Sequence, residues 1–122
     1  MKTLMILAAL ALSAAPALAQ PAMVGKTASG EVLVDAKGMT LYTFDKDGGG
    51  ASACVGECAV NWPPLPAASD AKAEGDFAPI ARADGSAQWA YKGKPLYTWI
   101  KDKAPGDITG DGVKEVWHLA RP

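Results

Sequence analysis

Histidine, cysteine and basic charge are all scarce in this chain of 122 residues. It has one histidine, two cysteines, and 12 lysines and arginines against 13 acidic residues, which gives a formal net charge of −1. A nucleic-acid-binding domain carries a basic patch, and no basic run occurs here, so we expect no nucleic-acid partner. Two thiolates alone do not complete a tetrahedral zinc site, and we predict no cofactor and no bound metal.

The common catalytic sequence motifs are also missing. The chain has no Gly-x-Ser-x-Gly elbow, no phosphate-binding loop and no dinucleotide fingerprint. We therefore favour a protein without catalytic activity. A hydrolase built on Asp47, Asp102 or His118 is the alternative, and it would require these side chains to meet in one cleft.

Long apolar runs are missing beyond the N-terminus. The single such run, residues 4–12, is too short to span a bilayer. It follows Lys2 and precedes an Ala-Leu-Ala stretch at residues 17–19, a pattern typical of a secretory signal peptide. We predict cleavage before Gln20, so that residues 1–19 are the signal peptide. The mature chain is then periplasmic or extracellular, with no stable membrane insertion.

The strongest feature that is present is an internal repeat. Residues recur at an offset of 55 positions, without a gap between Gly30 and Trp62. The matched pairs are Gly30 with Gly85, Lys37-Gly38 with Lys92-Gly93, Leu41-Tyr42-Thr43 with Leu96-Tyr97-Thr98, Lys46-Asp47 with Lys101-Asp102, and Trp62 with Trp117. We predict one all-β domain over residues 20–122, made of two pseudo-symmetric antiparallel units at about 24–66 and 79–122.

Each repeat is predicted to open with a β-hairpin. The strands are expected at 31–35 and 40–44 in the first copy, and at 88–91 and 96–100 in the second. A last strand is expected at 113–119, and 67–75 is expected to connect the copies.

Alternation along these strands places the aromatic side chains. It puts Tyr42 and Phe44 on one face of the first copy. Tyr97 and Trp99 then lie on the matching face of the second copy. We expect these four rings to form a shared core or to line a groove beside it.

The only two cysteines, Cys54 and Cys58, lie four positions apart in an exported chain. Oxidising compartments favour a disulfide between them. Closing so small a loop stabilises the fold by about 2 kcal/mol. A redox-active pair and a metal or haem ligand set are the alternatives.

For the other notable polar residues, we favour a structural role. Asp47 and Asp102 each follow a strand, where a carboxylate accepts backbone N–H groups of the next turn. His118 lies between Trp117 and Leu119 and is expected to point outward, with a general base or a copper ligand as the alternative.

Two loops have a weaker resemblance to binding motifs. Residues 107–112 resemble a calcium loop, but His118 stands where the twelfth-position glutamate would be. The Trp62-Pro63-Pro64 stretch predicts a rigid connector with a buried Trp62, or alternatively a docking surface.

Taken together, these motifs resemble a known family. The pattern Tyr-x-(Phe/Trp/Tyr)-x-x-Asp occurs in both copies, together with the cysteine loop and the Trp-Pro-Pro stretch. Its members here are Tyr42, Phe44 and Asp47, and Tyr97, Trp99 and Asp102. The chain resembles the bacterial "secreted repeat of unknown function" family, often described as predicted lipoproteins with this motif. The resemblance implies a fold and an envelope location, but no reaction.

The sequence departs from the lipoprotein description in one respect. Cys54 is its first cysteine, so no lipid-attachment cysteine stands at the predicted cleavage site. We predict an exported envelope protein of unknown molecular function, acting as a non-catalytic binding or structural module for a protein or a small ligand. The alternative is a redox or metal-handling protein that uses Cys54 and Cys58.

Overall fold

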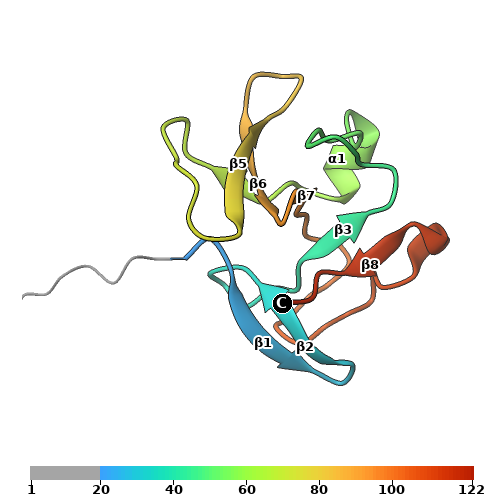
Figure 1. Cartoon of the computed structure of the whole chain (residues 1–122). Helices are drawn as coiled ribbons and strands as arrows, with labels where there is room; N and C mark the ends of the chain where they lie inside the picture. The colour runs from blue at the N-terminus through green and yellow to red at the C-terminus, as the bar shows by residue number, and fades with distance from the viewer. Residues whose placement is uncertain (1–19) are drawn as a thin grey trace, which may run out of the picture.

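The computed structural model describes residues 20–122, and the predicted signal peptide, residues 1–19, lies outside the described residues (Figure 1). The elements are β1 Met23–Thr27, β2 Gly30–Val34, β3 Tyr42–Phe44, α1 Glu57–Asn61, β4 Pro66–Ala67, β5 Phe77–Ala81, β6 Ala87–Tyr91, β7 Lys94–Pro95, the 3-10 turn η1 Val113–Glu115, and β8 Trp117–Leu119. All named strand pairs are antiparallel. The predicted all-β class with two pseudo-symmetric units is therefore confirmed.

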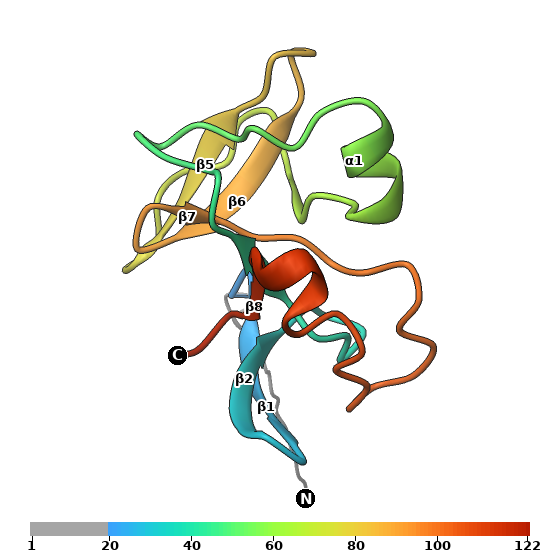
Figure 2. The same ribbon diagram turned by 90° about the vertical axis from the view of Figure 1, so that its right-hand side faces the viewer.

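Each repeat opens with a hairpin, β1–β2 in the first and β5–β6 in the second. The two hairpins extend from opposite ends of the molecule, with β3 and β8 between them (Figure 2). Strands β1 and β5 were not predicted, because Gly25 and Pro79 interrupt their patterns. A Cβ at Gly25 would lie 2.7 Å from Val34 Cγ1, so glycine permits close strand packing there. Pro79 is tolerated because β5 is an edge strand.

The two repeats exchange their final strands. Strand β8, which ends the second repeat, pairs with β3 of the first repeat. Strand β4, which ends the first repeat, pairs with β6 of the second. At the centre, Tyr42 and Tyr97 exchange backbone N–H···O bonds of 2.8 and 3.0 Å. The two repeats are therefore bound to each other by backbone pairing as well as by side-chain packing.

This exchange corrects the predicted hairpin partners. The segments 31–35 and 40–44 meet only at a bridge between Val34 and Thr40, because β2 pairs with β1 and β3 pairs with β8. In the second copy, the expected strand 96–100 is replaced by the short β7 and by bridges at Tyr97.

The gap-free repeat alignment is wrong at β2. The Leu33 N–H donates to the Ala120 carbonyl at 2.8 Å, and the Trp89 N–H makes the matching bond to Leu65 at 2.9 Å. Leu33 and Trp89 are therefore equivalent, and their offset is 56 rather than 55. The β5–β6 turn holds one extra residue, and the turn before β7 is one residue shorter, so the offset of 55 returns at Leu41 and Leu96.

The C-terminal strand is shorter than predicted. Only Trp117–Leu119 is extended, while Val113–Glu115 forms η1. Lys114 and Glu115 have φ angles of 52° and 63°, which lie in the left-handed region and prevent a strand. The one α-helix of the described residues, α1, lies in the cysteine loop.

Candidate functional site

A column of four aromatic rings crosses the boundary between the repeats. Phe44 stacks on Trp117 with ring centroids 4.2 Å apart. Trp117 stacks on Trp62 at 3.7 Å, with the two planes within 2°. Trp62 stacks on Trp99 at 4.0 Å. Equivalent rings of the two repeats therefore alternate along the column, with the two most buried rings in the middle.

Two buried tyrosines flank this column. Tyr42 packs edge-on against Trp62 at 5.4 Å, and Tyr97 packs edge-on against Trp117 at 5.1 Å. The Tyr42 hydroxyl donates to Asp102 at 2.6 Å, and the Tyr97 hydroxyl donates to Asp47 at 2.6 Å. The tyrosine of each repeat motif thus binds the aspartate of the other copy.

Burial governs the protonation of these groups. It raises the pKa of both tyrosines, and the neighbouring carboxylate in each pair adds to the effect. Burial also raises the pKa of Asp47, although the Ala53 N–H and the Tyr97 hydroxyl oppose that rise. Both tyrosines are therefore held as neutral hydrogen-bond donors.

The two aspartates also organise the loops that follow them. Asp47 accepts the Ala53 N–H at 2.6 Å, and Asp102 accepts both the N–H and the hydroxyl of Thr109. Neither carboxylate is hydrogen-bonded to the other or to His118 within the described residues. The three groups of the hydrolase alternative therefore have three separate sets of partners.

A groove of about 430 Å³ runs beside the aromatic column. Its lining comes from both repeats, in matched pairs at the offset of 55: Phe44 with Trp99, Cys58 with Val113, Asn61 with Val116, and Trp62 with Trp117. Its charged members are Lys46, Glu57 and Lys114. The walls are otherwise mostly apolar, so the groove is an aromatic-floored cleft with charges at a few points.

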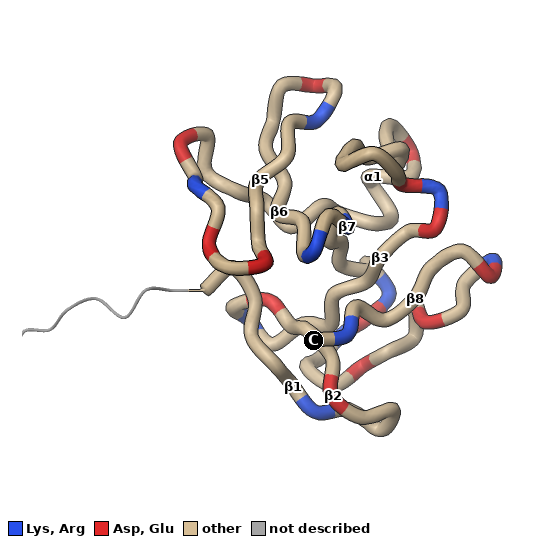
Figure 3. The backbone as a smooth tube through the Cα atoms, viewed as in Figure 1, with Lys and Arg blue, Asp and Glu red and all other residues tan. Residues whose placement is uncertain are grey.

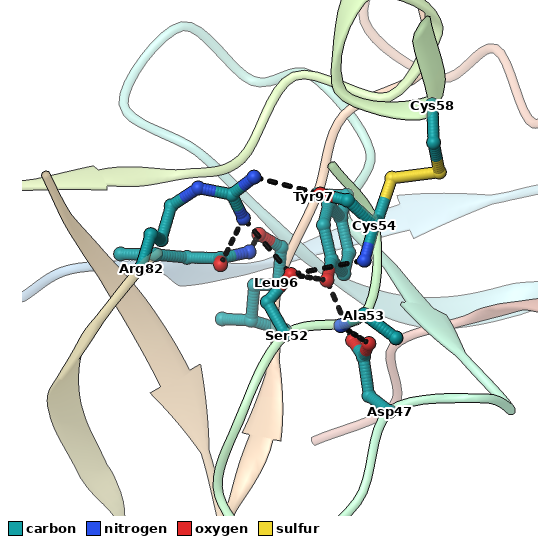
Figure 4. Close-up of a disulfide and its surroundings, with 9 residues drawn as sticks. Asp47, Ser52, Ala53, Cys54, Cys58, Arg82, Leu96 and Tyr97 are labelled. Carbon is teal, nitrogen blue, oxygen red and sulfur yellow. Dashed lines mark hydrogen bonds between the residues drawn. A yellow bond between two sulfur atoms is a disulfide. The ribbon is translucent and has the colours of Figure 1, made fainter. Parts of the chain in front are cut away.

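The disulfide joins Cys54 to Cys58, as the sequence predicts. Cys54 is fully buried, whereas Cys58 contributes to the groove wall. The Arg82 guanidinium donates to the Cys54 carbonyl at 2.7 Å and to Ser52 Oγ at 2.9 Å (Figure 4). Ser52 in turn lies 2.6 Å from the Tyr97 hydroxyl. A buried polar network therefore ties the cysteine loop of the first repeat to the second repeat.

His118 is exposed on β8 between the buried Trp117 and Leu119. Its Nε2 lies 2.8 Å from Asp45 Oδ2, with both side chains about half exposed. No group of three metal-ligating side chains occurs within residues 20–122. The carboxylate of Asp107, in the calcium-like loop, instead accepts the N–H groups of Lys103 and Ala104.

Comparison with protein-family models matches residues 23–66 and 78–121, separately, to the family described as a secreted repeat of unknown function. The chain belongs to that family. The two matches coincide with the two structural repeats, each running from the opening hairpin to the exchanged final strand. Comparisons with curated proteins and with solved structures give no significant match.

A secreted family and an internal disulfide agree with a location outside the cytoplasm. Among the residues that the structure describes, no helix is long and apolar enough to cross a membrane.

Sequence reasoning missed several residues of this region. Arg82 is one of them, because a lone arginine before a Gly turn gives no local signal of burial. Val113 and Asn61 line the groove only because the repeats face each other. Asp45 was also missed. It lies one residue beyond β3 and two residues from Thr43, which pairs with His118, so the pairing of β3 with β8 would have placed Asp45 beside His118.

Proposed function

We propose that this exported protein is a non-catalytic binding module, and that its aromatic groove takes a small, largely apolar ligand with a flat face. The observation that carries the proposal is the composite lining, in which both repeats supply matched residues to one cleft. A volume of about 430 Å³ lies in the range typical of small-molecule pockets.

The chemistry of the lining supports a ligand with a flat apolar face. Stacked and edge-on aromatic contacts contribute about 0.5–1.5 kcal/mol each beyond simple burial. Phe44 and Trp99, at the two ends of the column, are only partly buried and so retain surface for a ligand. Lys46 and Lys114 offer donors to a polar group of the same ligand.

A binding assay with phenylnaphthylamine, a neutral dye that fluoresces in apolar sites, tests this proposal. We expect saturable binding to the mature chain, accompanied by a change in tryptophan emission, because three of the four tryptophans line the groove. Val113→Trp fills the groove and should weaken dye binding by at least about tenfold, the equivalent of about 1.4 kcal/mol.

Val60→Trp is the matched control. Val60 is 62% exposed on α1 and does not line the groove, so this variant adds the same ring outside the cleft. It should bind the dye as the wild type does. Equal binding by the Val113→Trp variant and the wild type, or no saturable binding at all, would refute the groove as the site.

Redox activity of the disulfide is the second candidate function, because Cys58 lies on the wall of the same groove. A ligand in the groove would contact this half of the disulfide. Reduction in glutathione buffers, followed by alkylation and mass spectrometry, measures its potential. A potential as low as that of structural disulfides, below about −300 mV, would remove the redox candidate.

A further inference from the structure

A second cavity, of about 270 Å³, lies between β3, the end of β8 and the β6–β7 turn. Positively charged side chains dominate its charged lining: Lys92, Lys94 and Arg121, with His118 beside them and Asp45 as the one acid. Figure 3 shows basic positions at the C-terminus and beside β7. Because the whole chain has a net charge of −1, this concentration of cations is local.

The internal repeat provides a comparison surface within the same molecule. The Thr98 N–H donates to the Pro63 carbonyl at 2.9 Å. Thr98 and Pro63 are therefore neighbours, as are the equivalent residues Thr43 and His118 in the β3–β8 pair. The equivalent surface therefore exists in the other half. Its residues, matched at the offset of 55, are Ile100 for Asp45, Pro63 for His118, Met39 for Lys94 and Pro66 for Arg121.

In these four pairs, every charged or titratable residue belongs to the cavity and its partner in the other half is apolar, whereas Lys92 of the cavity matches another lysine, Lys37. Core positions of the two repeats, by contrast, keep the same type, as with Tyr42 and Tyr97 or Trp62 and Trp117. The backbone arrangement alone therefore does not require charge at this place.

Hydrogen bonds fix the positions of two side chains of this cavity, Arg121 and His118. Arg121 Nη1 donates to the carbonyl groups of Ser29 and Glu31, at 2.8 Å each, which fixes the guanidinium at the cavity. Its remaining N–H groups make no hydrogen bond within residues 20–122. The short contact between His118 and Asp45 orients the imidazole in the same way.

We propose that this second cavity binds a phosphate monoester carried on a small hydroxylated group, such as a glycerol or sugar phosphate. Lys92, Lys94 and Arg121 supply donors for the terminal oxygens of a dianion, for which arginine and lysine are the usual ligands in proteins. Asp45 accepts from a hydroxyl of the carrier, and the Tyr91 ring provides an apolar wall.

Titration calorimetry of the mature chain with glycerophosphate, glycerate and glycerol tests the proposal. We expect the phosphate to bind at least about tenfold more tightly than the carboxylate, and glycerol not to bind. Lys94→Met, which installs the residue of the other repeat, should weaken glycerophosphate binding about tenfold, as loss of one charged hydrogen bond does. Lys94 is exposed, so the variant is expected to fold.

Met39→Lys is the matched control, because it adds a lysine at the equivalent place in the other half. It should neither change the affinity nor create a second site, and the double variant Met39→Lys/Lys94→Met should bind as weakly as Lys94→Met. Restored affinity in the double variant, equal binding of glycerate, or an unchanged affinity in Lys94→Met would overturn the proposal. Phenylnaphthylamine binding should be the same in all these variants, so failure here is distinct from failure of the groove.

Vesicle co-sedimentation identifies the carrier of the phosphate. Binding to vesicles that contain phosphatidic acid, whose phosphate is a monoester, but not to phosphatidylcholine vesicles, with release by glycerophosphate, supports the site and places the phosphate on a lipid headgroup. Glycerophosphate binding without any vesicle binding supports the site and places the phosphate on a soluble molecule.

Discussion

The two repeats use the same core but close their long loops by different means. In the first repeat, the loop after β3 is closed by the Cys54–Cys58 disulfide and by Arg82. The motif aspartate accepts a loop N–H in both repeats, from Ala53 in the first and from Thr109 in the second, and the second loop has only the Thr109 hydroxyl as a further bond to its aspartate, Asp102. Both loops nevertheless deliver an aspartate to the tyrosine of the other copy.

The comparison separates what the fold requires from what each half has added. Aromatic and tyrosine–aspartate positions occur in pairs, because each repeat needs the other to complete its packing. The disulfide and the Asp45–His118 pair occur once. Features that only one repeat has are not needed for the shared fold, and they are therefore the better candidates for a functional role.

The strongest test of the paired core is to truncate its two central rings. Trp62→Ala and Trp117→Ala should each lower the free energy of unfolding by about 3–5 kcal/mol, because each ring loses two stacked neighbours and one edge-on tyrosine. Denaturant unfolding measures both values. Trp89→Ala, outside the column, should cost less, and a large difference between Trp62 and Trp117 would break the equivalence of the repeats.

Removing one tyrosine hydroxyl from each repeat probes the reciprocal bonds. Tyr42→Phe and Tyr97→Phe should each cost about 2 kcal/mol, because a hydrogen bond to a carboxylate is lost away from solvent. Urea denaturation of the two variants side by side gives the comparison. If only one variant is destabilised, the two tyrosine–aspartate pairs are not energetically equivalent.

The loops should differ where the core does not. Replacing Cys54 and Cys58 together by serine should destabilise the protein by about 2 kcal/mol, from the loop-closure entropy of a small ring. Thr109→Ala, at the matching loop, should cost about 1 kcal/mol through its bond to Asp102. Thermal unfolding of both variants shows which loses more stability. A larger loss of stability in Thr109→Ala than in the double serine variant would contradict the prediction.

The smallest effect is confined to alkaline pH. The pKa of Tyr42 and of Tyr97 is raised in the folded state above the ordinary value of 10.0, so the unfolded chain ionises first. Their contribution to stability is complete below pH 10.0 and is lost as the pH rises above it. Unfolding measured across this range should be steeper in the wild type than in Tyr42→Phe or Tyr97→Phe; equal slopes would contradict the shift.

The repeat, the strand-rich class and the disulfide could be predicted because each leaves a local or periodic signal. The motif tyrosines and tryptophans recur at one offset, and two cysteines in an exported chain usually form a disulfide. The strand exchange could not be predicted, because a hairpin partner and a partner from the other repeat satisfy the same residue pattern.

The candidate sites depended on this missing information. The groove exists only where the repeats face each other, and Asp45 meets His118 only because β8 lies beside β3. The left-handed Lys114 and Glu115 were also missed, since neither residue type prefers that conformation. Both side chains are exposed, and the turn is held by backbone bonds within the second repeat, such as that from the Glu115 N–H to the Gly112 carbonyl at 2.9 Å.

Because the repeats exchange their final strands, the connector between β4 and β5 has a role in assembling the fold. It acts as a tether that keeps two mutually dependent halves at a high effective concentration. Proteolytic cleavage of this segment would give two fragments that remain associated through the exchanged strands. If the segment were too short to span that distance, each half would pair with the complementary half of another molecule, and the product would be a domain-swapped dimer.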